Sequence, residues 1–293
     1  MYSIKKTDGR WLATFELERP AYPTSQTKLA DSIKSMISVK LVEAKTSKQQ
    51  NYARLGLQSI DIDDSMASLV TLKTDEKSWQ VIVGNKVSPG GGQYVLKIGD
   101  IESWKTDKTI TLPIDKFFWL KKPILLYQSH DIRPVLRVDS QDWHIVRSVS
   151  GNFELMNMPK DRELAYASIL NSIIGSLTSL DFEHLFFADE FFKPIKVLTQ
   201  LEVSTEDNNV FQVAVSELDD KYLVSFSSES NSEYWQQWYY QISNFSAKQL
   251  IRTSNDLLAK ENTILSNINK TNKNIEEGKS PYYRVRGTPR ETS

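Results

Sequence analysis

The chain has 293 residues, 40% of them hydrophobic and 25% charged, which is the composition of a folded globular protein of about two domains. Its 36 Lys and Arg residues nearly balance 37 Asp and Glu residues, so composition offers no concentrated basic surface for nucleic acid. The absence of cysteine excludes disulfides, iron–sulfur clusters, thiolate zinc sites and cysteine nucleophiles. No stretch reaches the roughly 20 apolar residues of a membrane-spanning helix, so we expect no transmembrane segment in this chain.

Strand and helix signals follow one another through the first half of the chain. An extended run over 11–17 leads into a proline-broken segment in which Thr24 or Ser25 is placed to cap a helix. Apolar residues at helical spacing, from Leu29 to Ile37, predict that helix. Beyond it the sequence predicts strands at 67–73, 79–83 and 94–98 and a helix at 114–120. The glycine run 90–92 predicts a turn before the last of these strands.

The second half shows a similar order of signals. A strand at 143–146 and a break at Pro159 precede a helix whose apolar stripe runs from Leu170 to Leu177. Strands are predicted at 197–203, 210–215, 222–226 and 238–242. A closing helix is predicted over 246–260, with Ser246 as its N-cap.

Two pairs of anchors indicate an internal repeat. Trp11 and Trp143 are 132 residues apart, and so are Trp79 and Phe211, which open two similar apolar segments. We therefore predict an α+β fold of two tandem diverged repeats, over 1–128 and 129–262, each a mainly antiparallel sheet with packed helices. A fraying helix and a disordered polar tail are expected over 263–293. Chance similarity between two α+β segments is the alternative.

Motifs that carry chemistry are weak in this sequence. The glycine run 90–92 sits between two predicted strands, whereas a phosphate-binding loop opens a helix. None of His130, His144 and His184 has a second ligand at helical metal spacing, and the acidic residues of 61–64 lack the spacing of a calcium loop. We therefore expect no catalytic residue, no metal site and no cofactor, and predict that the protein is not an enzyme. Dispersed carboxylates that meet in the fold are the alternative.

Two aromatic clusters are the candidate interaction surface. The segment 234–240 carries large rings on both faces of a predicted strand, so one face is expected to pack on the core and the other to face a partner. A second cluster flanks the acidic pair 189–190 in a predicted loop. The candidate surface residues are Trp235, Trp238, Tyr240, Phe186, Phe187 and Phe191. Burial in the core, or between the two repeats, is the alternative for both clusters.

Three short elements in the first half carry a family resemblance. Tyr52 with Leu55-Gly56-Leu57, then 81–84, then Gly91-Gly92-Gln93-Tyr94-Val95, stand in the order of a "YGL" element, an "L-x-I-G" strand and a "G-G-x-Y-V" strand. In this respect the chain resembles the bacterial domain-of-unknown-function 4340 family over about residues 9 to 260. It departs from the family pattern in having Tyr-Ala-Arg-Leu-Gly-Leu in place of a contiguous YGL.

The resemblance implies a location and a kind of partner. Members of this family typically follow an N-terminal membrane anchor and lie outside the cytoplasmic membrane, often with ABC-type transport systems of the gliding-motility auxiliary kind. It therefore implies a periplasmic protein, anchored through an upstream segment trimmed from this sequence, whose partners are membrane transport components. A cytoplasmic location is the alternative, because the N-terminus has no apolar core of a signal peptide. The family has no known catalytic residues to carry over.

The leading hypothesis is a non-enzymatic accessory or adaptor module of a membrane transport system. The repeat, the missing catalytic motifs and the family resemblance support it. The second hypothesis is a module that binds a glycan or another small ligand in a cleft between the repeats. The sequence gives no oligomeric state.

Overall fold

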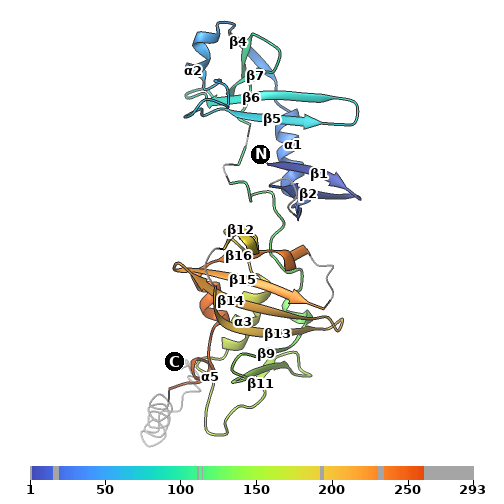
Figure 1. The fold of residues 1–293 in the computed structure, drawn as a ribbon, viewed down its shortest axis with the longest axis vertical. Helices are drawn as coiled ribbons and strands as arrows, with labels where there is room; N and C mark the ends of the chain where they lie inside the picture. The colour runs from blue at the N-terminus through green and yellow to red at the C-terminus, as the bar shows by residue number, and fades with distance from the viewer. Residues whose placement is uncertain are drawn as a thin grey trace, which may run out of the picture. The chain divides into compact units, whose positions relative to one another are not determined.

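The computed structural model describes residues 2–15, 20–110, 112–113, 115–191, 195–229 and 234–260. The chain divides into two compact units, Met1–Lys121 and Lys122–Ser293 (Figure 1). Each unit combines helices with antiparallel sheets, which confirms the predicted α+β class. Within the described ranges, no helix is long and apolar enough to cross a membrane. The tail predicted over 263–293 lies outside the described residues.

The first unit opens with a three-stranded sheet and a helix. Strands β1 (Ser3–Thr7), β2 (Arg10–Thr14) and β3 (Tyr22–Pro23) pair in that order. Asp8 and Gly9 turn the first hairpin, both with positive φ, as a tight Asp-Gly turn requires. Helix α1 (Gln26–Ile37) follows and confirms the predicted helix. Of the two candidate caps, Ser25 is the N-cap of α1, because its Oγ accepts a hydrogen bond from the Lys28 backbone N–H at 3.5 Å.

The first unit also holds a five-stranded antiparallel sheet in the order β4-β8-β7-β6-β5. Its strands are β4 (Leu41–Thr46), β5 (Ser68–Lys73), β6 (Ser78–Lys86), β7 (Gln93–Lys97) and β8 (Ser103–Thr106), and the short helix α2 (Tyr52–Leu55) lies between β4 and β5. The three strands predicted here are confirmed as β5, β6 and β7. The two strands β4 and β8 were not predicted, because charged residues interrupt their short apolar pattern.

Apolar side chains pack on both faces of this sheet. On one face, Leu57, Ile82 and Leu96 form a buried cluster with Tyr52 and Tyr94 beside them. On the other face, Val83, Val95 and Ile110 form a second cluster, which the C-terminal end of α1 partly covers through Met36. This second face holds the candidate site.

The helix predicted over 114–120 is wrong. Its described residues, 115–120, form turns that end in a bridge between Leu120 and Thr24. The Asp115 side chain accepts a hydrogen bond from the backbone N–H of Phe117 at 2.8 Å, and the backbone N–H of Leu120 donates to the Phe117 carbonyl. An aspartate that bonds its own neighbouring backbone competes with helix formation in this way.

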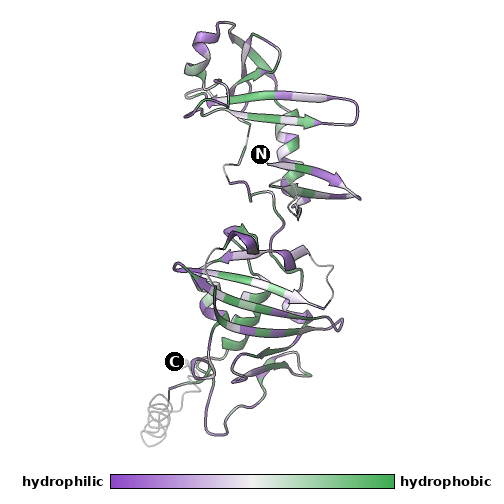
Figure 2. Ribbon diagram, viewed as in Figure 1, coloured by the Kyte–Doolittle hydropathy of each residue, from purple (hydrophilic) through white to green (hydrophobic). Residues whose placement is uncertain are grey.

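The second unit is built on an eight-stranded antiparallel sheet in the order β11-β10-β9-β13-β14-β15-β16-β12. Its strands are β9 (Ile132–Arg137), β10 (His144–Arg147), β11 (Phe153–Leu155), β12 (His184–Phe186), β13 (Lys196–Thr205), β14 (Val210–Leu218), β15 (Lys221–Ser228) and β16 (Tyr239–Ile242). Apolar and polar residues alternate along the central strands (Figure 2), and the apolar positions of β14, Phe211, Val213 and Val215, are buried.

Two helices complete the buried layer of the second unit. Helix α3 (Ile169–Thr178) confirms the predicted helix; its stripe of Leu170, Ile173, Ile174 and Leu177 is almost fully buried. Helix α4 (Asn244–Leu250) packs against α3 and buries Ala247 and Leu250.

Several elements of the second unit differ from prediction, and its strands β9, β11 and β12 were not predicted. The helix predicted over 246–260 is two short helices, α4 and α5 (Ser254–Leu257), because Thr253 and Asp256 form a capping box that starts a new helix. The N-cap of α4 is Ser243 rather than Ser246. The strand predicted across 234–240 begins only at Tyr239, and Tyr234–Gln237 forms a 3₁₀ helix.

The sheets of the two units share part of their strand order. The order β4-β8-β7-β6-β5 of the first unit matches the order β12-β16-β15-β14-β13 in the second unit, where β13 also pairs with β9. The two-repeat interpretation, with its ranges 1–128 and 129–262, stays a prediction.

Candidate binding groove

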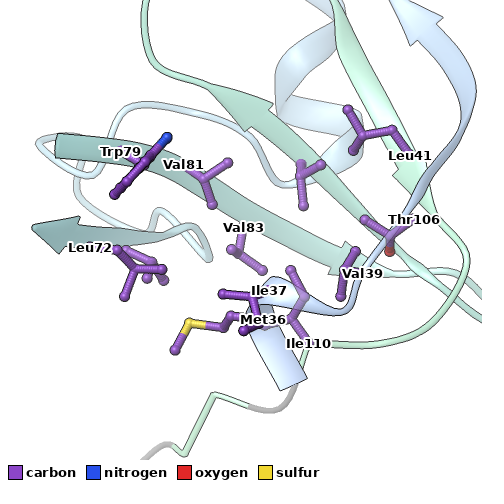
Figure 3. A pocket seen from close by; sticks show the side chains of 12 residues that line it. Met36, Ile37, Val39, Leu41, Leu72, Trp79, Val81, Val83, Thr106 and Ile110 are labelled. Carbon is purple, nitrogen blue, oxygen red and sulfur yellow. The ribbon is translucent and has the colours of Figure 1, made fainter. Parts of the chain in front are cut away.

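An open apolar groove of about 220 Å³ lies on one face of the five-stranded sheet, beside the C-terminal end of α1 (Figure 3). Strands β5 and β6, the end of α1 and the segments after α1 and β8 supply most of its walls. The lining residues are Met36, Ile37, Val39, Leu41, Val70, Leu72, Trp79, Val81, Val83, Val95, Thr106 and Ile110.

The strand register brings the groove side chains together. In the β5–β6 pair, Val70 lies opposite Val81 and Leu72 lies opposite Trp79. Directly paired residues of antiparallel strands point to the same face, so these four side chains form one apolar surface. Val83, next but one after Val81, continues that surface into the buried cluster of the sheet.

Much of the groove lining is exposed. Trp79 is 48% exposed, Leu41 55% and Ile37 69%, although large apolar side chains are stabilised by burial. Helix α1 is itself poorly covered, since Leu29 and Ser32 are its only buried residues. The end of α1 and the adjoining sheet face therefore present apolar surface that the first unit does not cover with its own described residues.

A second hollow of about 310 Å³ runs along α1 and meets the groove at Ile37, which lines both. Besides Ile37, it is lined by Trp11, Gln26, Leu29, Ala30, Ile33 and Lys34. The two hollows together form an apolar strip that passes from β2 across the last turns of α1 to β5 and β6.

The chemistry of the groove is that of an apolar docking surface. Thr106 is the one polar residue among the described lining residues. Its hydroxyl accepts a hydrogen bond from the Gln93 backbone N–H at 2.8 Å and lies 2.7 Å from the Lys108 carbonyl, so it is committed to the fold. None of these lining residues is titratable, and the groove therefore provides neither an acid–base pair nor polar groups that would orient a sugar.

Four of the six aromatic residues predicted to form an interaction surface lie in the interior of the second unit, which corrects that prediction. Trp235, Trp238, Tyr240 and Phe187 are 5%, 2%, 0% and 9% exposed. Trp235 lies in the 3₁₀ helix and Trp238 directly after it, and the ring centroids of Phe187 and Trp238 are 4.1 Å apart. Their burial corresponds to the core-packing alternative.

The remaining two predicted residues, Phe186 and Phe191, are half-buried and lie together at the β12–β16 edge. Their ring centroids are 5.5 Å apart, and Phe191 also meets Tyr239 edge-on at 5.1 Å. His184 packs on Phe186 with centroids 4.5 Å apart. The rings of this cluster pack mainly against one another.

The three histidines occupy separate places. His130 lies 3.2 Å from Asp131 on the surface, His144 opens β10, and His184 lies on β12 at the opposite end of the sheet. Across the described parts of the chain, no three His, Asp or Glu side chains gather as metal ligands would. The expectation that the protein holds no metal stays a prediction.

A charge cluster around the buried Arg137 stabilises the fold of the second unit. Arg137, whose side chain is 8% exposed, donates to Asp139 at 3.0 Å and to the Arg252 carbonyl at 3.0 Å. Asp139 also accepts hydrogen bonds from the Thr199 hydroxyl and the Gln200 backbone N–H, each at 2.9 Å. Burial acts to raise the pKa of Asp139, but these hydrogen bonds outweigh burial and hold its pKa below the usual value.

The groove was not predicted from the sequence. Apolar residues at alternate positions of both β5 and β6 were a usable signal, because Leu69 and Ile82 supply a second apolar face opposite Val70 and Val81. A small sheet with apolar residues on both faces needs other segments to cover each face.

Comparison of the chain with protein-family models, curated proteins and solved structures gives no match, and the family resemblance stays a prediction.

Proposed function

We propose that this protein is a non-enzymatic accessory module that binds a partner protein through the apolar groove of its first unit. The observation that carries the proposal is the open groove between α1 and the β5–β6 hairpin, with Trp79, Leu41 and Ile37 about half-exposed or more. Surfaces of this kind on folded proteins mark sites of association.

The groove fits the side chains of a protein better than a free ligand. Its volume of about 220 Å³ is below the roughly 300–1,000 Å³ of pockets that enclose small molecules, and it is open on one side. Tryptophan is enriched among the residues that contribute most of the binding energy of protein interfaces. Met36 adds an unbranched side chain that adapts to the shape of an incoming apolar group.

The identity of the partner in this proposal rests on the family resemblance alone. We propose a periplasmic location and a component of an ABC-type membrane transport system as the bound protein. We also propose that the two units are diverged copies, supported by the 132-residue spacing of Trp11 and Trp143 and of Trp79 and Phe211.

Affinity capture of the native, full-length protein from gently solubilised membranes, with mass spectrometry of the bound proteins, tests this function. Trp79→Glu places a charge in the groove, and Gln80→Glu places the same charge on the opposite face of the same strand. We expect an ABC permease or its auxiliary subunit to be captured by the wild type and Gln80→Glu and lost with Trp79→Glu.

Circular dichroism of both variants shows whether the fold is kept. Capture of the transport component by folded Trp79→Glu would remove the groove from the proposal. Recovery of the protein alone, or from the soluble fraction only, would overturn the transport partner.

A further inference from the structure

The outer strands of the described sheets differ in how they are protected against pairing with another chain. Strand β4 has register irregularities at two places, and β1 carries Lys5 and Lys6. Strands β3, β11 and β12 have two or three residues each. Bulges, lysines and short length are the usual means by which sheet edges avoid unwanted pairing.

Strand β5 has no bulge and six residues, and its one lysine, Lys73, is its last residue. It is the outer strand of a hairpin with β6 (Figure 1), and the two pair from Ser68 to Lys73 without a bulge. Its sequence, Ser-Leu-Val-Thr-Leu-Lys, has no proline and a single charge at its last position. Among the described residues, β6 is the only strand that pairs with β5. The other edge of β5 therefore offers a row of backbone donors and acceptors.

We propose that the outer edge of β5 pairs antiparallel with β5 of a second copy of this chain, joining two five-stranded sheets into one. A second copy brings an edge of the same length and the same alternation of apolar residues, and pairing covers both unprotected edges at once. Such a contact is isologous, with a two-fold axis, and it closes as a dimer. The irregular, charged β4 at the far edge of each sheet prevents further growth.

The alternation of side chains along β5 selects the register. Residues directly opposite one another in an antiparallel pair point to the same face, so a groove-face residue must meet a groove-face residue. With Thr71 on the two-fold axis, Val70 of each copy lies opposite Leu72 of the other, and the two grooves form one continuous apolar face. On the other face, Lys73 lies beside Leu69 rather than beside the second Lys73. With Val70 on the axis instead, Leu72 would lie opposite Ser68, with less apolar contact.

The pairing is expected to be reversible. One pair of six-residue strands makes a small interface compared with the roughly 1,200–2,000 Å² of stable complexes. We therefore expect monomer and dimer to exchange, with the dimer fraction rising with protein concentration. Sedimentation velocity of the full chain over a wide concentration range measures this fraction.

A charge exchange on the two-fold axis gives a specific test. Thr71 is exposed, so Thr71→Lys and Thr71→Glu leave the core intact but place like charges opposite each other in the dimer. We expect each variant alone to sediment as a monomer and an equal mixture of the two to dimerise at least as well as the wild type. Gln80→Lys, on the neighbouring position of β6 and the same face, is the matched control and should dimerise like the wild type.

Several outcomes would overturn the proposal. A wild type that stays monomeric at every concentration excludes the pairing and leaves the groove proposal untouched, since the two use different variants. A Thr71→Lys protein that dimerises like the wild type excludes this edge. A mixture no heavier than its components excludes the register with Thr71 on the axis.

Discussion

The side chain of Gln93 donates a hydrogen bond of 2.8 Å to the backbone carbonyl of Gly84. Its carbonyl oxygen accepts one of 3.0 Å from the backbone N–H of Ile110, and its own backbone N–H donates to Thr106 at 2.8 Å. Gln93 is buried, so one side chain joins β6, β7 and the segment after β8. Gly84 and Gln93 both belong to the short elements on which the family resemblance rests, and their roles here are structural.

Gly84→Ala is expected to destabilise the first unit. A Cβ at this position would lie 2.4 Å from the Leu55 carbonyl oxygen and 2.8 Å from that of Gly56. Both are backbone atoms, so α2 must shift to make room, and we expect a loss of about 1–3 kcal/mol in the free energy of unfolding. Urea unfolding followed by tryptophan fluorescence measures it.

Gly175→Ala is the control for this substitution. Gly175 lies within α3, and a Cβ there would meet no atom within 4 Å. Alanine in a helix interior should therefore raise stability by roughly 0.5–1 kcal/mol. Equal effects of the two substitutions would contradict the close approach of Gly84 to α2.

Elements with strong apolar periodicity could be predicted from the sequence. The stripe from Leu29 to Ile37 gave α1 and the stripe from Leu170 to Leu177 gave α3, because a helix brings large apolar residues at this spacing onto one face, whereas a strand would divide them between two. Strands rich in β-branched and aromatic residues, such as β6 and β14, were found from their own composition. Strands β4 and β8 were missed, since charged residues interrupt their short apolar pattern.

The aromatic segment 234–240 shows why exposure is harder to predict than structure. As one strand, it would present Trp235 and Trp238 on opposite faces. A 3₁₀ turn followed by a strand instead turns both inward, with Tyr240 and Ile242 continuing the buried face. The groove was missed for a related reason: whether Val70 and Leu72 are covered depends on distant segments, which local pattern does not describe.

Trp238→Ala is expected to destabilise the second unit severely. Trp238 is 2% exposed and packs against Phe187, so its truncation leaves a large cavity in the core. We expect a loss of about 3–5 kcal/mol. Trp79→Ala, at a side chain that is 48% exposed, should cost about 1 kcal/mol or less.

Thermal and urea unfolding of these two variants compare the two tryptophans directly. A stable Trp238→Ala protein that had lost partner capture would favour the 234–240 segment as an interaction surface after all. Comparable losses of stability for both variants would contradict the exposure of Trp79.

The charge cluster around Arg137 predicts a loss of stability in acid. The pKa values of Asp139, Asp142 and Asp256 are all held below their usual value, against the opposing effect of burial. For Asp142 the lowering comes from Ser140, the backbone N–H of Ser254 and Arg137, and for Asp256 from the backbone and hydroxyl of Thr253.

The direction of this pH effect on stability follows from proton binding. These carboxylates protonate at higher pH in the unfolded chain, near pH 3.9, than in the folded unit, so the unfolded state binds more protons as the pH falls. Their contribution to stability is therefore complete above about pH 5 and declines from about pH 4 downward.

Asp139→Asn tests both parts of this argument. At neutral pH it leaves Arg137, 8% exposed, without its closest carboxylate, and we expect a loss of about 2 kcal/mol in the free energy of unfolding. Below about pH 4 the variant should lose less further stability than the wild type, because one of the titrating groups is gone. Asp161→Asn, at an exposed position, should follow the wild type throughout. Urea unfolding at a series of pH values gives both quantities, and an unchanged acid slope in Asp139→Asn would show that the instability in acid arises elsewhere.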